Sequence, residues 1–129
     1  MRLGLLFERW RLAGNAGVII NTASLIGLWP MASAPVYAAA KAGVVNFSRS
    51  LAYLAEESNI RVNAICPEIV DTPMAVGLGE ESLGELRAAR GILRPEDIAA
   101  GVVELIEDDS RFGAVMKVTI LGGREYATM

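Results

Sequence analysis

The sequence contains no histidine and a single cysteine, Cys66, among its 129 residues. Without histidine, serine–histidine and cysteine–histidine catalysis are excluded, and a zinc site is disfavoured, so we expect no metal ion. Any acid–base chemistry must therefore use tyrosine, lysine, aspartate or glutamate. One cysteine cannot form an internal disulfide bond, so we expect a reducing, cytoplasmic setting.

Charged residues are also few, and positive charge is in deficit. They make up 21% of the chain, and 12 basic against 15 acidic residues give a net charge of −3. Nucleic acid is not expected as a partner, because no basic surplus exists to neutralise phosphates. The apolar fraction of 53% excludes a disordered chain, and the length suits one small domain.

Residues 12–40 contain no charged side chain, and that run is long enough to span a bilayer. A lipid-exposed helix would nevertheless be broken at Pro30 and Pro35 and would bury several polar groups. We therefore interpret the run as a strand, a loop and the start of a helix, and expect no membrane partner. Glu8 and Arg9 interrupt the apolar residues near the amino terminus, so we expect no signal peptide.

Apolar periodicity and turn residues predict alternating helices and strands. Helices are expected over residues 2–12, over 35–57 and from Pro95 onward, and strands over residues 18–23, 60–66 and 114–121. Residues 71–91 mix glycines with helix formers and are expected to be mobile and partly helical. The alternation indicates an α/β fold, with about three parallel strands joined by right-handed crossovers and flanked by helices.

The helix expected over residues 36–57 carries two apolar stripes. One consists of Val44, Phe47, Leu51 and Leu54, and the other of Ala38, Ala42, Val45 and Ala52. Both stripes must be covered in a stable protein. We expect the sheet to cover one and a second copy of the chain to cover the other, which makes a homo-oligomer.

Three residues could carry chemistry: Ser24, Tyr37 and Lys41. Tyr37 and Lys41 are four apart on the expected helix, so their side chains share a face. An ammonium beside a phenol stabilises the phenolate and makes it a better proton donor and acceptor near neutral pH. Ser24 follows the expected strand over 18–23, where parallel α/β sheets place their sites. Its hydroxyl would hold a substrate oxygen beside the phenol.

Structural interpretations of the same residues stay open. A tyrosine and a lysine at this spacing are common by chance, Lys41 would serve as a solvated charge, and Ser24 would serve as a capping residue. Cys66 is more typical of a small buried apolar residue than of a reactive thiol. The acidic runs at residues 80–81 and 107–109 are more typical of solvated helix and turn positions than of metal ligands.

The order of the motifs is more specific than any one of them. The segment GVIINTAS over residues 17–24 precedes Tyr37 and Lys41, and NAICPEIVDT follows over residues 63–72. From about Met1 to Gly123 the chain resembles the short-chain dehydrogenase/reductase family, in which these motifs occur in this order. Its tail is similar to the NAD-dependent prostaglandin dehydrogenase subgroup of that family, on Gly91-Ile92-Leu93, residues 105–109 and residues 113–117.

The resemblance implies a Rossmann-like, doubly wound parallel sheet and an NAD(P)-dependent oxidoreductase, with NAD favoured. It implies that Tyr37 is the catalytic acid/base, that Lys41 assists it and holds the nicotinamide ribose, and that Ser24 orients the substrate oxygen. The residues implied to line the nicotinamide are Pro67, Ile69, Val70 and Thr72. Residues 71–91 would form a substrate lid, and the substrate would be a small hydrophobic alcohol or ketone.

The chain departs from the family pattern in ways that bear on the cofactor. The glycine-rich turn that binds the pyrophosphate has no counterpart before Val18, and the family's catalytic asparagine would fall slightly before Met1. Residues 1–129 are therefore expected to be a partial domain without the glycine-rich dinucleotide-binding half. Glu68 replaces a glycine, which would bring a carboxylate close to the nicotinamide.

Two functional hypotheses follow. The first is hydride transfer between a nicotinamide cofactor and a secondary alcohol or ketone. The second is a non-catalytic remnant of such an enzyme that acts only as a dimerisation or interaction module.

Overall fold

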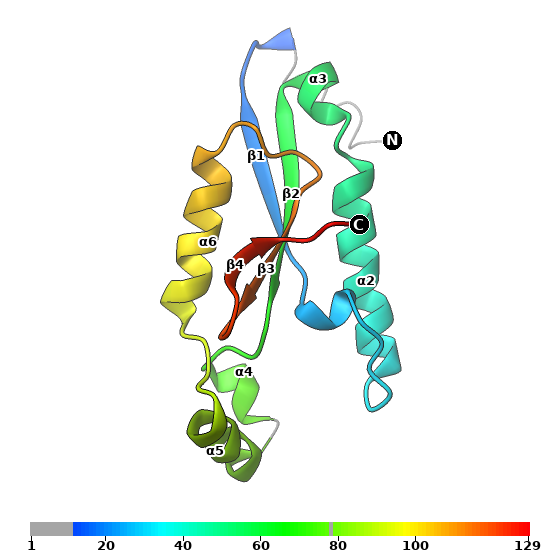
Figure 1. The fold of residues 1–129 in the computed structure, drawn as a ribbon. Helices are drawn as coiled ribbons and strands as arrows, with labels where there is room; N and C mark the ends of the chain where they lie inside the picture. The colour runs from blue at the N-terminus through cyan, green and yellow to red at the C-terminus, as the bar shows by residue number, and fades with distance from the viewer. Residues whose placement is uncertain (1–11, 78) are drawn as a thin grey trace.

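The structure is a computed structural model that describes residues 12–77 and 79–129. A sheet lies between two helical layers, with α2 and α3 on one side and α6 on the other (Figure 1). The helices are the 3-10 helix η1 (Leu25–Gly27), α2 (Pro35–Ser50), α3 (Leu54–Ser58), α4 (Pro73–Val76), α5 (Glu80–Ala89) and α6 (Pro95–Glu107). The strands are β1 (Gly17–Thr22), β2 (Ile60–Pro67), β3 (Val115–Thr119) and β4 (Gly123–Tyr126). The helix expected over residues 2–12 lies outside the described residues, apart from Leu12.

The charge-free run over residues 12–40 contains β1, η1 and the start of α2, as its prolines indicated. Pro35 occupies the first turn of α2, where its missing N–H costs nothing. Within residues 12–77 and 79–129, no helix combines the length and the apolar character needed to cross a membrane.

The strands follow the order β1-β2-β3-β4, and β1, β2 and β3 are parallel. The predicted α/β fold class with about three parallel strands is thus confirmed, and an antiparallel fourth strand that was not predicted joins the sheet. The fourth strand, β4, runs antiparallel to β3 and places Lys117 opposite Glu125, with an ion pair of 3.2 Å. Adjacent glycines, Gly122 and Gly123, form the turn, and Gly123 adopts a φ of 65° that favours glycine. Those glycines were the available sequence signal for a hairpin.

The prediction of a single helix over residues 35–57 is wrong, because the chain forms two helices there. α2 ends at Ser50, and a tight turn leads into α3, where the Ala52 and Leu54 N–H groups bond carbonyls three residues earlier. Gly113 packs against this turn so closely that an added Cβ would lie 2.7 Å from the Ala52 Cβ. Asn59 ends α3 in a left-handed conformation, φ 54°, which asparagine adopts more readily than most residues.

The two predicted apolar stripes also need correction. Val45 is buried, and Val44 packs against the same core cluster, although the two were assigned to different stripes. Phe47 remains 52% exposed. The inward face of α2 also includes Ser48, whose hydroxyl donates to the Val44 carbonyl at 2.8 Å and accepts from Asn21 Nδ2 at 3.0 Å. The sheet therefore covers one continuous face of α2.

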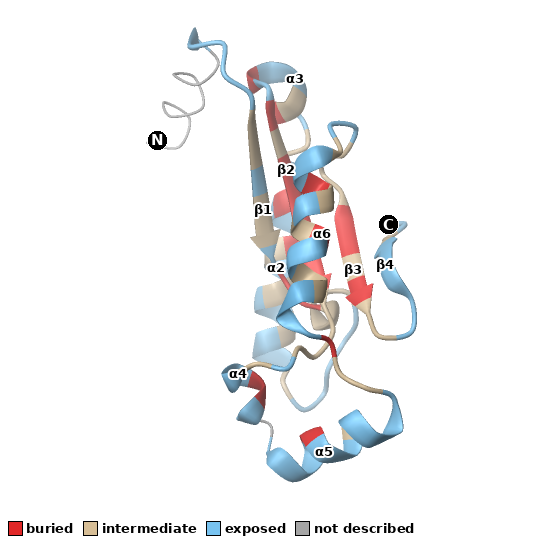
Figure 2. Ribbon diagram, turned by 90° about the vertical axis from the view of Figure 1, so that its left-hand side faces the viewer, coloured by how far each residue is buried: buried red, intermediate tan, exposed pale blue. Residues whose placement is uncertain are grey.

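The core is centred on β2 and β3 (Figure 2). Ala64 and Cys66 face α2, whereas Ile65 packs in the cluster that contains Leu105 of α6 and Met116. Strands buried on both faces are typical of parallel sheets covered by helices. The centre of the sheet is therefore rigid, and its carboxyl edge can position a site.

Candidate functional site

The predicted site residues come together at the carboxyl edge of the sheet. β1 and β2 are parallel with Thr22 opposite Ile65, so both strands end at the same edge. Ser24 follows β1, and the chain leaving β2, residues 67–72, is called the exit segment below. α2 begins beside this edge and packs against η1 (Figure 1). Loops at the carboxyl edge of parallel sheets are where α/β proteins bind ligands.

Lys41 connects β1 to the exposed phenol of Tyr37. Its ammonium donates to the Thr22 carbonyl, with Nζ and O 3.3 Å apart, and lies 5.8 Å from the centre of the Tyr37 ring. Tyr37 is 45% exposed, so its hydroxyl end can meet a ligand. The four-residue spacing therefore produces the side-by-side arrangement expected from the sequence.

Ser24 is nearly buried, at 9% exposure, and caps η1. Its hydroxyl oxygen accepts the Ile26 N–H at 3.3 Å, which matches the capping interpretation left open from the sequence. A serine hydroxyl that accepts one bond keeps its own proton for donation. The cap therefore fixes the side chain and leaves a donor for a substrate oxygen.

Gly27 lets η1 approach α2 and was not singled out from the sequence. A Cβ at this position would lie 2.8 Å from both the carbonyl carbon and oxygen of Lys41. A glycine in a loop just before a chemistry-bearing helix was the available signal. The close approach sets the distance between Ser24 and the Tyr37–Lys41 face.

Substitution of this glycine should destabilise the protein. We expect Gly27→Ala to lower the free energy of unfolding by about 2 kcal/mol, because backbone atoms on both sides resist the added methyl group. Gly43→Ala is the matched control on α2, since nothing lies within 4 Å of an added Cβ there. It should stabilise by about 0.5–1 kcal/mol through helix propensity. Urea denaturation of both variants checks this, and equal effects would contradict the close approach.

The exit segment is held against the chain that precedes α6. Val70 pairs with Leu93, the Leu93 N–H donates to the Ile69 carbonyl at 3.3 Å, and the Asp71 N–H donates to the Leu93 carbonyl at 2.7 Å. The Thr72 hydroxyl lies 3.4 Å from the Val70 carbonyl. The residues assigned to the nicotinamide by resemblance, including Pro67 at the end of β2, thus form one continuous strip that is bonded to the chain before α6.

The sequence position of Glu68 suggested a free carboxylate close to the nicotinamide. In the structure, both oxygens of that carboxylate are already engaged. One oxygen accepts the Ile120 N–H at 3.1 Å, and the other pairs with the Arg90 guanidinium. The side chain is only 11% exposed. Its charge is therefore compensated by groups from two distant parts of the chain.

Cys66 lies buried behind the site, beside Ser24 and Lys41. Burial raises the pKa of its thiol from 9.0 to about 11, and the Ser24 backbone bond and Lys41 charge oppose this only in part. The thiol therefore stays protonated at neutral pH, as expected for a packing residue rather than a nucleophile.

This shift predicts a pH dependence of stability. Because the folded pKa exceeds the unfolded one, the stabilisation is complete below about pH 9 and is lost as the pH rises toward about 11. At pH 10.5 the expected loss from this group is about 2 kcal/mol relative to pH 8. Urea unfolding at both pH values should show this extra loss in the wild type and not in Cys66→Ala. A parallel decline in both proteins would contradict it.

The acidic runs act as structural groups. Asp108 bonds Ser110, which holds the pKa of its carboxyl below the usual range, and Asp109 pairs with Arg61 at 3.1 Å. Glu80 and Glu81 lie in the first turn of α5, where negative charge is favourable. Among the described residues, no group of three potential metal-binding side chains occurs.

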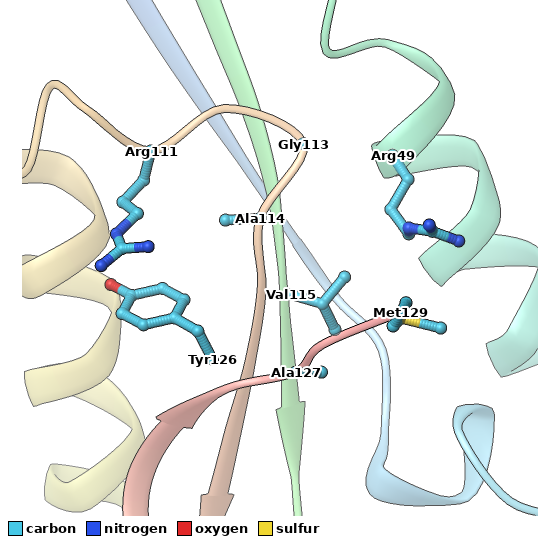
Figure 3. Close-up of a pocket in the computed structure, with 8 residues that line it drawn as sticks. All are labelled: Arg49, Arg111, Gly113, Ala114, Val115, Tyr126, Ala127 and Met129. Carbon is cyan, nitrogen blue, oxygen red and sulfur yellow. The ribbon is translucent and has the colours of Figure 1, made fainter.

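A cavity of about 250 Å³ lies at the opposite, amino end of β3 (Figure 3). It is lined by Arg49, Arg111, Gly113, Ala114, Val115, Tyr126, Ala127 and Met129, and by none of the predicted catalytic residues. Arg111 lies over the Tyr126 ring, 3.8 Å from its centre. Figure 3 shows Arg49 on the other side of the cavity, so the two arginines do not converge. This cavity is separate from the predicted site.

Comparison with known proteins places this geometry in a family. A family model described as enoyl-(acyl carrier protein) reductase matches residues 6–123. The mouse protein named 15-hydroxyprostaglandin dehydrogenase [NAD(+)] is 41% identical over 137 residues, covering 96% of this chain and 51% of the relative. Cis-4-hydroxycyclohexanecarboxylate dehydrogenase of Sinomonas cyclohexanicum is 38% identical over 111 residues, covering 82% of this chain and 45% of the relative. The chain thus spans about half the length of the curated relatives it matches.

Solved structures agree with these relatives. A ketoreductase of actinorhodin polyketide synthesis, solved with NADPH, superimposes with a TM-score of 0.71 at 30% identity, covering 83% of this chain and 47% of that chain. L-Sorbose reductase of Gluconobacter frateurii, solved with NADPH and L-sorbose, gives a TM-score of 0.72 at 28% identity, covering 82% and 47%. The motifs, the parallel sheet and these matches together show that the chain belongs to the short-chain dehydrogenase/reductase family, of which it spans the carboxyl-terminal region.

Proposed function

We propose that this chain carries the hydride-transfer site of an NAD(P)-dependent oxidoreductase that interconverts a secondary alcohol and a ketone. The observation that carries the proposal is the position of Lys41, whose ammonium bonds the Thr22 carbonyl and lies over the Tyr37 ring. Ser24 is fixed at the same edge of the sheet by its cap on η1. Carbonyl reduction requires a hydrogen-bond donor, a proton carrier and a positive charge beside it, and Ser24, Tyr37 and Lys41 would supply these in turn.

Each residue has a distinct role in this proposal. The Ser24 hydroxyl donates to the substrate oxygen and orients it, and the Tyr37 hydroxyl exchanges a proton with that same oxygen. Lys41 keeps a positive charge beside the phenol and so favours its deprotonated form during alcohol oxidation. When bound, the nicotinamide supplies the acceptor of the hydride that leaves the carbinol carbon.

The residues present fit such a cofactor. The backbone of the exit segment is bonded to the chain before α6, and both acidic groups there are already paired. Glu68 pairs with Arg90 and accepts the Ile120 N–H, and Asp71 pairs with Arg87. We propose that Tyr37 and Lys41 contact the nicotinamide ribose. Pro67, Ile69, Val70 and Thr72 would line the nicotinamide ring. NAD is favoured over NADP because the mouse relative's name specifies NAD(+), and a small hydrophobic alcohol or ketone is the proposed substrate.

The outer face of α2 supports a second copy of this chain as a partner. On α2, Val36 is 82% exposed and Phe47 is 52% exposed, and Tyr53, which precedes α3, is also 52% exposed. Apolar groups exposed along one helix are typical of contact surfaces. This partner is a proposal that sedimentation can test.

A second candidate is a non-catalytic interaction module. Within residues 12–77 and 79–129, β1 pairs with β2 on one side and with no strand on the other, and Ile19 is 37% exposed. A free strand edge favours association with another chain. A monomer in sedimentation experiments, with a cooperative melt, would count against this candidate and against the homo-oligomer.

Cofactor titration tests the first candidate. The purified chain is titrated with NADH while nicotinamide fluorescence is followed, and NAD⁺ reduction is measured with a panel of hydrophobic secondary alcohols. In a second arm, residues 1–129 replace the matching half of the mouse relative, so that activity is also measured in a chain of the relatives' length. We expect NADH binding and turnover in the second arm at least. No binding and no turnover in either arm would refute hydride transfer.

A further inference from the structure

The Glu68 side chain joins the exit segment to two other parts of the fold. Among the described residues of that segment, it is the only one whose two carboxylate oxygens bond different elements. One oxygen accepts the N–H of Ile120, in the turn between β3 and β4. The other pairs with Arg90, which directly follows α5. A single carboxylate thus fastens the end of β2 to two distant segments.

Burial makes this contact stronger than an ordinary surface ion pair. The Glu68 side chain is 11% exposed and the Arg90 side chain 42%, so the carboxylate end of the pair is withdrawn from water and less screened by solvent and salt. Asp71, three residues later, pairs with Arg87 of α5 at 2.6 Å. The two side chains of this pair are each more than 40% exposed. The exit segment and the end of α5 therefore meet through one sheltered pair and one exposed pair.

On the α5 side of this contact, the backbone takes little support from the sheet. Gly91, next to Arg90, adopts a φ of 86°, which only glycine takes easily. The Gly91 and Arg90 N–H groups both donate to the Leu86 carbonyl, so the end of α5 closes on itself rather than on the sheet. Leu83 is the one buried residue of α5. The Glu68 carboxylate thus ties the end of α5 to the exit segment, whose own backbone is bonded to Val118 and Leu93.

We propose that Glu68 is a positioning residue for the cofactor strip of the exit segment, and that Arg90 is its partner; the proposal rests on the proposed function. With both oxygens engaged, the backbone of Ile69 and Val70 is held at one distance from Ser24. A nicotinamide seated on that strip would therefore find it already ordered. Glu68 contacts neither substrate nor cofactor in this role.

The test compares Glu68→Gln, Arg90→Met and the matched control Arg87→Met in the full chain. Glu68→Gln keeps an oxygen for the Ile120 N–H but loses the charge that holds Arg90. We expect hydrogen exchange of the amides of residues 69–71 and 90–93 to accelerate about tenfold in Glu68→Gln and Arg90→Met. Arg87→Met should change exchange by less than about threefold, because its ion pair is exposed.

Two further measurements distinguish a positioning role from a purely structural one. They are the affinity for NADH and a double-mutant cycle of Glu68 and Arg90. The NADH dissociation constant should rise about fivefold in Glu68→Gln and in Arg90→Met, with kcat little changed in the longer chain used to test the function. Arg90→Met should add nothing in the Glu68→Gln background.

Three outcomes would overturn the proposal: unchanged exchange in Glu68→Gln, additive effects of the two changes, or faster exchange with unaltered NADH affinity. Absence of NADH binding and of turnover both in the wild-type chain and in the longer chain would instead refute the proposed function, and with it the cofactor role. The exchange data would then still decide whether Glu68 anchors the exit segment.

Discussion

Tyr37→Phe should reduce kcat for NAD⁺-dependent alcohol oxidation by about 10³-fold, the size expected when a general acid–base group is removed. The change deletes one oxygen from a side chain that is 45% exposed, so the fold has little reason to alter. The ring that lies beneath the Lys41 ammonium is retained, and with it the contact at 5.8 Å. The loss should therefore appear mainly in kcat, with the melting temperature nearly unchanged.

The matched control is Tyr53→Phe. Tyr53 is 52% exposed, and it precedes α3 at a point remote from the carboxyl edge of the sheet. Loss of its hydroxyl should leave turnover within about twofold of the wild type, since surface changes rarely perturb a distant site. Turnover is followed at 340 nm in the longer chain used to test the function. Equal losses in the two variants, or substantial activity left in Tyr37→Phe, would remove Tyr37 from the chemistry.

The local part of the site could be predicted because its geometry depends on short spacings. Tyr37 and Lys41 share a helix face once residues 35–50 are helical, and Pro35 marks where that helix begins. Ser24 follows a strand whose apolar residues are easy to recognise. The parallel order of β1, β2 and β3 followed from the alternation of strands and helices. The predictions for Ser24, Tyr37 and Lys41 use information within about twenty residues, whereas the parallel sheet was inferred from the alternation of elements along the chain.

The surroundings of Glu68 show what local patterns could not supply. Its partner Ile120 lies 52 residues further along the chain. No periodicity or motif indicates which distant group will compensate a charge, so the sequence suggested only a carboxylate beside the nicotinamide. The break after α2 was missed for a related reason. Leu51 and Ala52 are good helix formers, and the turn there depends on the approach of Gly113 from a distant loop.

Arg61 attaches the carboxyl end of α6 to the sheet. Its guanidinium extends from β2 and donates to the carbonyls of Leu105, Ile106 and Asp108, at 2.8, 2.7 and 3.1 Å. The last carbonyls of a helix have no partner within the helix and carry partial negative charge. α6 has no basic residue in its last turn, so the charge comes from a strand instead.

Arg61→Met should lower the free energy of unfolding by about 3 to 5 kcal/mol, because it leaves several sheltered carbonyls unpaired at once. The methionine keeps the apolar stem, so the loss measures the guanidinium and not the packing. The side chain is 13% exposed, which limits the water available to replace it.

Arg94→Met, at the other end of α6, is the control. That side chain is 72% exposed, and its nearest contact with Asp97 is 3.9 Å, so less than about 1 kcal/mol should be lost. Urea denaturation of both variants gives the comparison, and similar losses at the two ends would show that α6 does not depend on Arg61.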